Sequence, residues 1–128
     1  MGQQLRFRTL SDVFAIVHLA PDALVPGWAS KGEFISITRT PDELSIVCPI
    51  ENIPADAHSP HRWRCLKLEG PFPFTQTSVL LSFIEPLSGN DIPIFAVSTY
   101  DTDYVLIPQE LAERAVAVLQ QAGHVEIL

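Results

Sequence analysis

The sequence predicts an α+β fold in which helices cover one face of an antiparallel sheet. Two stretches, residues 79–87 and 111–122, place apolar side chains at the spacing of an amphipathic helix. Shorter stretches rich in branched and aromatic residues are bounded by turns containing Pro, Gly or Asp, as strands and hairpins are. The order of these stretches along the chain indicates the architecture.

The second half of the chain reads β-α-β-β-α-β. A strand over RWRCLKLEG, ending at Gly70, precedes a helix for which Thr75 is a candidate N-cap. Pro86 should end or bend this helix, and Gly89 with Asn90 closes it. A hairpin of residues 94–100 and 103–107 follows. A second helix then begins near Pro108 and stops at Gly123, before a short closing strand, HVEIL. This order is the ferredoxin-like split βαβ arrangement.

The first half repeats the opening of that pattern. VFAIVHLA is typical of a strand, and PDALVPGWA of a short helix or turn interrupted by proline. EFISITRTPDELSIVCP predicts a hairpin, and the Pro-containing stretch after it a connecting loop. We therefore predict an abbreviated N-terminal unit, residues 1–60, in tandem with a complete unit, residues 61–128, the two sharing one core.

Charge and hydropathy exclude two classes of partner. The formal net charge of −7 argues against a nucleic-acid binder, because neutralising phosphates needs a cluster of Lys and Arg. The apolar runs are far shorter than the ~20 residues that span a membrane, and MGQQLRFR lacks the apolar core of a signal peptide. Cys48 and Cys65 are expected to be reduced core thiols. We expect a cytoplasmic protein without nucleic-acid or membrane partners.

The two hairpins, SITRTPDELSIV and STYDTDYVLI, together with RWRCLKLEGP and the amphipathic helix, resemble the small bacterial tandem ACT-domain proteins. This ACT-like family is related to the CASTOR arginine sensors. The resemblance extends from about Phe7 to the end of the chain. It implies ACT-type units with a ferredoxin-like fold. It also implies a regulatory function, in which a small ligand, usually an amino acid, binds between two units, here within a homodimer.

The same resemblance implies the site residues. The ligand carboxylate would meet backbone N–H groups of the loop PFPFTQTS, and Asp103 would accept the ammonium group, with Thr99 and Tyr100 opposite it on the hairpin. A helix N-terminus in that loop offers unpaired N–H groups and a partial positive charge. The loop holds two prolines, which lack N–H donors, and no glycine. The predicted ligand-binding residues are Thr75, Gln76, Thr77, Ser78, Thr99, Tyr100 and Asp103.

Structural explanations compete with several of these assignments. Asp101 is better explained as a turn residue, and Asp103 equally well as a hairpin residue or a ligand contact. Ser78 and Thr77 are typical helix-start residues in any case. The pair His58 and His61 lies in a Pro-rich loop without a further ligand, so we predict no metal site and no cofactor.

Catalysis has little support in the sequence. No nucleophile elbow, Gly-rich phosphate loop, HExxH or CxxC motif occurs. We therefore predict a non-catalytic, ACT-type regulatory module that binds a small molecule, an amino acid by preference. The alternative is an ACT-fold protein without a ligand, which binds a protein partner through its surface.

Overall fold

The computed structural model describes residues 3–57, 61–73, 76 and 78–128, which divide into two compact units. Unit 1 comprises Met1–Leu10 and Arg64–Leu128, and unit 2 comprises Ser11–Trp63. The boundary that the sequence predicts between residues 60 and 61, and the core that the two units are predicted to share, stay predictions. No helix among the described residues is long and apolar enough to cross a bilayer.

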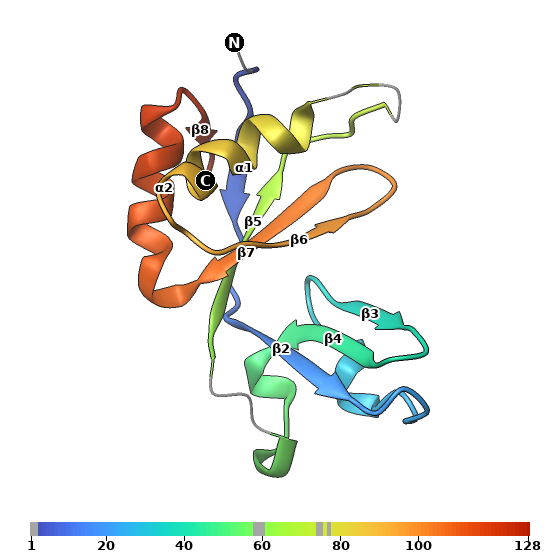
Figure 1. The fold of residues 1–128 in the computed structure, drawn as a ribbon. Helices are drawn as coiled ribbons and strands as arrows, with labels where there is room; N and C mark the ends of the chain where they lie inside the picture. The colour runs from blue at the N-terminus through green and yellow to red at the C-terminus, as the bar shows by residue number, and fades with distance from the viewer. Residues whose placement is uncertain (1–2, 58–60, 74–75, 77) are drawn as a thin grey trace. The chain divides into compact units, whose positions relative to one another are not determined.

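The described residues of unit 1 form five strands of one sheet and two α-helices (Figure 1). Its elements are β1 (Arg6–Thr9), β5 (Trp63–Leu68), α1 (Val79–Gly89), β6 (Phe95–Ser98), β7 (Asp103–Pro108), α2 (Ala112–Gln121) and β8 (Val125–Glu126). The strand order is β6-β7-β5-β1-β8. From β5 to β8 this is the ferredoxin-like βαββαβ order, with β1 inserted between β5 and β8. The predicted fold class is confirmed.

The N-terminal strand β1 was not among the predicted elements. It pairs antiparallel with β5, with Phe7 opposite Leu68, and parallel with β8, with Phe7 opposite Glu126. Phe7 is fully buried and meets the ring of Phe83 edge-on, 5.3 Å between centroids. A strand from the other end of the chain therefore contributes a central side chain to the core of unit 1.

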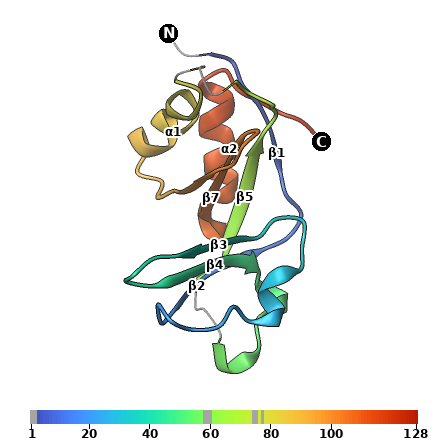
Figure 2. The same cartoon turned by 90° about the vertical axis from the view of Figure 1, so that its right-hand side faces the viewer.

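Both helices lie on the same face of this sheet (Figure 2). Alternate residues of the strands point toward them, Leu66 and Leu68 from β5 and Val105 and Ile107 from β7. From the helices come the apolar positions that the periodicity predicts, namely Val79, Phe83 and Leu87 in α1 and Ala115, Val118 and Leu119 in α2. Burial of these side chains, at about 1.5–3 kcal/mol for each large one, is what holds the helices to the sheet.

The first helix ends at Gly89 with Asn90 as its C-cap, where the sequence predicts its close, but it differs from the prediction at its N-cap and at Pro86. It begins at Val79 with Ser78 as N-cap, and Thr75, the predicted cap, lies outside the described residues. It also continues through Pro86 to Gly89. A proline was expected to end or bend the helix because it removes an N–H donor. A side chain from outside the helix replaces that donor, as described below.

Unit 2 consists of three antiparallel strands in the order β3-β4-β2. These are β2 (Phe14–Leu19), β3 (Ser36–Arg39) and β4 (Leu44–Pro49). The 3-10 helix Gly27–Ser30 lies between β2 and β3, and the 3-10 helices Ile50–Asn52 and Ala55–Ala57 follow β4. The predicted "helix or turn" of PDALVPGWA is thus a 3-10 turn, and the described part of unit 2 contains no α-helix. Its assignment as an abbreviated ACT-like copy stays a prediction.

Candidate ligand-binding site

A cavity of about 380 Å³ opens in unit 1 beside the N-terminus of α1. We call it the site cavity. Its lining comes from the loop before α1, the first turn of α1 and the turn between β6 and β7. The lining residues are Phe72, Pro73, Gln76, Ser78, Val79, Leu80, Leu81, Ser98, Thr99, Tyr100, Asp101, Thr102 and Asp103.

Five of the seven predicted site residues lie on this lining. They are Gln76, Ser78, Thr99, Tyr100 and Asp103. The other two, Thr75 and Thr77, lie outside the described residues. The fold therefore brings together two segments, separated by some twenty residues of helix and strand, that the sequence grouped only by resemblance. Ligand binding by these residues stays a prediction.

Asp103 opens β7, directly opposite Ser98 at the end of β6. The hydroxyl of Ser98 donates a hydrogen bond to Oδ1 of Asp103. The side chain of Asp103 is half-buried, and the carboxylate has further acceptor capacity beyond this one bond. An ionised carboxylate oriented in this way can accept from a second donor, such as an ammonium group.

The turn that carries Asp103 is closed by its own backbone and by Thr99. The N–H of Thr99 donates to the carbonyl of Thr102 at 2.8 Å, and Oγ1 of Thr99 donates to the same oxygen at 3.1 Å. Thr102 is buried, with 7% of its surface exposed, and its Oγ1 donates to the carbonyl of Leu68 at 2.8 Å. Thr102 thereby ties the turn to the end of β5.

Thr102 was not predicted as a structural determinant of the site. In the sequence it stands between Asp101 and Asp103, in a polar stretch where nothing distinguishes an inward hydroxyl from an outward one. Its burial depends on Gly70, at the end of the neighbouring segment. A Cβ at Gly70 would lie 2.9 Å from the carbonyl oxygen of Asp101 and 3.1 Å from Cβ of Thr102. The close approach of the two segments therefore requires glycine there.

The opposite wall is the N-terminus of α1. Ser78 has the left-handed conformation, φ 69°, and its side chain makes no capping hydrogen bond. The first turn of α1 carries no acidic residue. The first N–H groups of a helix have no intrahelical partner, so this end presents donors and a partial positive charge at the cavity. A non-glycine residue held in the left-handed region is strained, and such strain clusters at functional sites.

The loop before α1 offers few donors of its own. Pro71 and Pro73 have no N–H, the N–H of Phe72 donates to the carbonyl of Asp101 at 2.8 Å, and that of Gln76 to the carbonyl of Pro73 at 3.0 Å. A ligand carboxylate would therefore find its backbone N–H donors in the first turn of α1 rather than in the described part of the loop.

Negative charge predominates around the site cavity. Asp101 and Asp103 lie on its lining, and no Lys or Arg does among the described residues. Tyr100, 79% exposed, and Leu81, 55% exposed, stand at its rim. A second cavity of about 280 Å³, lined by Pro71, Phe72, Pro73, Tyr100 and Asp101, adjoins it through four shared residues. The two together form an open, acidic and partly aromatic depression.

The described His, Cys, Asp and Glu side chains bear on two kinds of chemistry, metal binding and thiol reactivity. They contain no group of three or more placed to hold a metal ion. Cys48 and Cys65 are buried and reduced, and desolvation raises the pKa of the Cys48 thiol to about 11. A thiol that stays protonated at neutral pH is a poor nucleophile.

The chain is similar to known proteins in family, sequence and structure. A family model described as an ACT domain matches residues 58–121, and a second model, described as an N-terminal domain, matches residues 12–56. The cytosolic arginine sensor for mTORC1 subunit 1 of Bos taurus is 27% identical over 123 residues, which are 88% of this chain and 37% of that protein. The putative protein CASTOR3P of Homo sapiens is 31% identical over 91 residues, 61% of this chain and 56% of that protein.

Two solved structures illustrate the likeness of fold. A crystal structure of an Agobacterium tumefaciens protein has a TM-score of 0.92 and 43% identity, covering 99% of this chain and 95% of that one. The ligand-free regulatory subunit of aspartate kinase from Thermus thermophilus has a TM-score of 0.59 and 16% identity, covering 87% and 93%. The second likeness concerns the fold alone. The chain spans little more than a third of the bovine sensor and about half of CASTOR3P.

Proposed function

Since this chain belongs to the ACT domain family, we propose that it is a non-catalytic regulatory module that binds an amino acid in the site cavity of unit 1. The observation that carries the proposal is the pairing of two chemically opposite walls. The N-terminus of α1 offers N–H donors, and Asp103 offers a carboxylate across the same cavity. A free amino acid has the matching pair of groups.

The ligand carboxylate is assigned to the first turn of α1. Backbone N–H groups and the helix dipole together bind an anion without a basic side chain. The hydroxyl of Ser78 and the amide of Gln76 lie on the same lining and can add donors. Thr75 and Thr77 are proposed to contribute hydroxyls in the same way.

The ligand ammonium group is assigned to Asp103. The hydroxyl of Ser98 orients this carboxylate, and Thr99 and Tyr100 follow on the same turn. A hydrogen bond between an ammonium group and a carboxylate is charge-assisted and stronger than a neutral one. Asp103 therefore distinguishes an amino acid from a simple carboxylic acid.

The chemistry of the lining favours a ligand with a cationic side chain. Asp101 remains as a second carboxylate beside the rings of Tyr100 and Phe72, and these groups suit a guanidinium or an ammonium ion. The name of the bovine relative, an arginine sensor, agrees with this choice. We propose arginine or lysine as the ligand.

The exposed rim of the site cavity suggests that a second unit completes the site. Tyr100 and Leu81 leave large apolar surfaces in water at the mouth. We propose a homodimer in which these side chains become covered, as the resemblance to ACT domains implies. Light scattering with and without the ligand measures the oligomeric state.

The experiment that tests the function is thermal unfolding of the purified protein against each of the twenty amino acids. A ligand at about 100 times its dissociation constant stabilises the folded state by ~2.7 kcal/mol. For a chain of this size the midpoint should rise by roughly 10 °C. We expect arginine or lysine to raise it and the acidic amino acids not to. A flat panel would count against the proposed function.

The site assignment is tested by Asp103→Asn. This variant keeps the size of the side chain and removes the charge that the ammonium group needs. The binding free energy of the ligand should weaken by at least ~1.4 kcal/mol, a tenfold loss of affinity, and the ligand should raise the unfolding midpoint correspondingly less. Asp56→Asn, an exposed position in unit 2, is the matched control. Unchanged binding by Asp103→Asn would show that the ammonium group binds elsewhere.

A second candidate function is binding of a protein partner without any amino acid. The shortage of N–H donors in the loop and the exposure of Leu81 and Tyr100 favour it. The panel separates the two functions, because a partner-binding protein would show no shift with any amino acid. Partner capture in that case would be lost with Tyr100→Ser and Leu81→Ser.

A further inference from the structure

Pro86 leaves one carbonyl of α1 without its helical donor. Residue 86 would normally donate its N–H to the carbonyl of Ser82, one turn earlier, and proline has no N–H to give. A buried carbonyl without a partner is costly, and this normally ends or distorts a helix at proline. In this chain the helix continues to Gly89.

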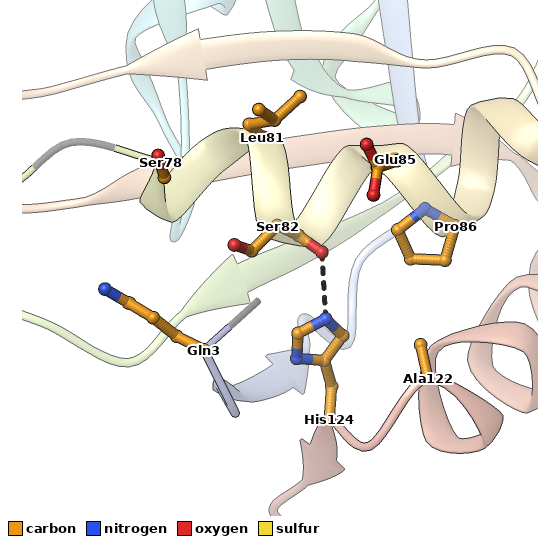
Figure 3. Close-up of a pocket in the computed structure, with 8 residues that line it drawn as sticks. All are labelled: Gln3, Ser78, Leu81, Ser82, Glu85, Pro86, Ala122 and His124. Atoms are coloured by element: carbon orange, nitrogen blue, oxygen red, sulfur yellow. Dashed lines mark hydrogen bonds between the residues drawn. The ribbon is translucent and has the colours of Figure 1, made fainter. Parts of the chain in front are cut away.

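His124 supplies the missing donor. Its Nε2 lies 3.0 Å from the carbonyl oxygen of Ser82 (Figure 3). Its Nδ1 accepts the N–H of Leu5 at 3.0 Å. Because Nδ1 acts as an acceptor, the ring proton is on Nε2, and both ring nitrogens are satisfied in this one tautomer. The ring is 5% exposed and packs against Phe83, with 5.6 Å between centroids.

A third cavity, of about 390 Å³, lies on the His124 side of α1. We call it the Pro86 cavity. Its lining includes Ser82, Pro86 and His124, and also Ser78 and Leu81, which line the site cavity as well (Figure 3). The first turn of α1 therefore borders both cavities. The Pro86 cavity leaves open space next to α1, and the hydrogen bond from His124 to Ser82 lies at the edge of that space.

We propose that His124 is a positioning residue for the site cavity. Its neutral imidazole links Ser82 to Leu5, just before β1, and so keeps the first turn of α1 facing the turn that carries Asp103. When this link is lost, α1 can shift into the Pro86 cavity, and the N–H donors move away from the ligand. The role in binding rests on the proposed function, whereas the shift of α1 can be observed without any ligand.

Substitutions at His124 and Pro86 can separate the effect of His124 on the position of α1 from its effect on the stability of the fold. His124→Asn keeps an acceptor near the position of Nδ1 for Leu5 and loses the donor to Ser82. His124→Gln places an amide nitrogen near the position of Nε2 and is the conservative variant. Pro86→Ala restores the helical N–H, so the carbonyl of Ser82 is satisfied without His124. His18→Asn, an exposed position in unit 2, is the matched control.

Arginine and lysine titrations of these variants give the first readout. We expect His124→Asn to weaken binding of the responding amino acid by at least about fivefold, in the range of typical coupling between sites, and His124→Gln to restore part of it. In the Pro86→Ala background, His124→Asn should no longer lower the unfolding midpoint yet should still weaken binding. If Pro86→Ala rescues binding as fully as stability, His124 only satisfies a carbonyl and the proposal is overturned.

Amide NMR spectra without ligand give the second readout. A shift of α1 in His124→Asn should move the resonances of the turn 99–103 across the site cavity, whereas His18→Asn should not. Unmoved resonances would overturn the positioning role. Failure of the wild-type protein to bind any amino acid would instead overturn the proposed function, while the NMR comparison would still decide whether His124 positions α1.

Discussion

Glu69, just after β5, lies among three cations on unit 1. Nε of Arg8 donates to its carboxylate at 2.8 Å, and this hydrogen bond is the main cause of a lowered pKa of Glu69. Partial desolvation opposes the effect, and the positive charges of Arg8, Lys67 and Arg6 add to it. Arg8 and Lys67 stand directly opposite each other on neighbouring strands, where like charges repel. Glu69 relieves that repulsion.

The pH dependence of this ion pair follows from the direction of the shift. A carboxyl group whose pKa is lower in the folded state stabilises the fold above its unfolded pKa of about 4.3, and the contribution is lost as the pH falls through the folded pKa. Glu69→Gln should therefore reduce the free energy of unfolding at pH 7 by about 0.2–1 kcal/mol, the range of exposed pairs. Urea unfolding at pH 7 and pH 3 checks this, and an equal difference at both values would contradict it.

Individual residues of the candidate site differ in how far the sequence could predict them. Ser78 and Asp103 were identified from the resemblance to ACT domains, because the local pattern explains Ser78 equally well as a helix-start residue and Asp103 as a hairpin residue. The left-handed backbone of Ser78 and the bond from Ser98 to Asp103 arise from tertiary packing and strand register. His124 could not be predicted, since its partners Ser82 and Leu5 lie 42 and 119 residues away in the sequence.

The turn between β6 and β7 is the element whose position depends most on one buried hydroxyl. Thr102→Val keeps the shape of the side chain but leaves the carbonyl of Leu68 without the donor that Thr102 supplies. We expect a loss of about 1–3 kcal/mol in the free energy of unfolding, because a buried acceptor is left unsatisfied. Chemical unfolding measures it. Thr38→Val, at an exposed position of β3, is the control and should stay within ±0.5 kcal/mol.

At the scale of elements, the sequence predicted best where the pattern is long and the partners are near. Helical periodicity over residues 79–87 and 111–122 located α1 and α2, and two strand-like stretches on either side of a polar turn located the β6–β7 hairpin. Proline was the exception in α1. Its usual effect on a helix was cancelled by His124, from an element that contacts α1 only in the folded chain. Local rules cannot anticipate a donor that arrives from elsewhere.

At the scale of the whole molecule, β1 is the strand that the local sequence pattern could not predict. Its four residues, RFRT, are too short and too charged to indicate a central strand. Only Phe7 within it is buried, and its partners β5 and β8 lie near residue 65 and near the C-terminus. The strand is formed because the gap between β5 and β8 accepts it, which is a property of the assembled sheet.

Removal of residues 1–10 should therefore unfold unit 1. Without β1, β8 loses the strand it pairs with, the core loses Phe7, and His124 loses the N–H of Leu5. Loss of a buried phenylalanine alone costs about 3–5 kcal/mol, a large share of the 5–15 kcal/mol that stabilises a typical domain. Circular dichroism and the dispersion of NMR resonances of residues 11–128 would reveal the loss of a cooperative fold.

A synthetic peptide of residues 1–10 provides the decisive control. Added to the shortened chain, it should insert between β5 and β8 and restore cooperative unfolding, while the same peptide with Phe7→Asp should not, because it would bury a charge. The contrary outcome is equally informative. If residues 61–128 alone unfold cooperatively with a native-like spectrum, the complete C-terminal unit that the sequence predicts is independent of β1. His124 could then hold α1 only through Ser82, and His124→Asn in that fragment should still displace the turn that carries Asp103.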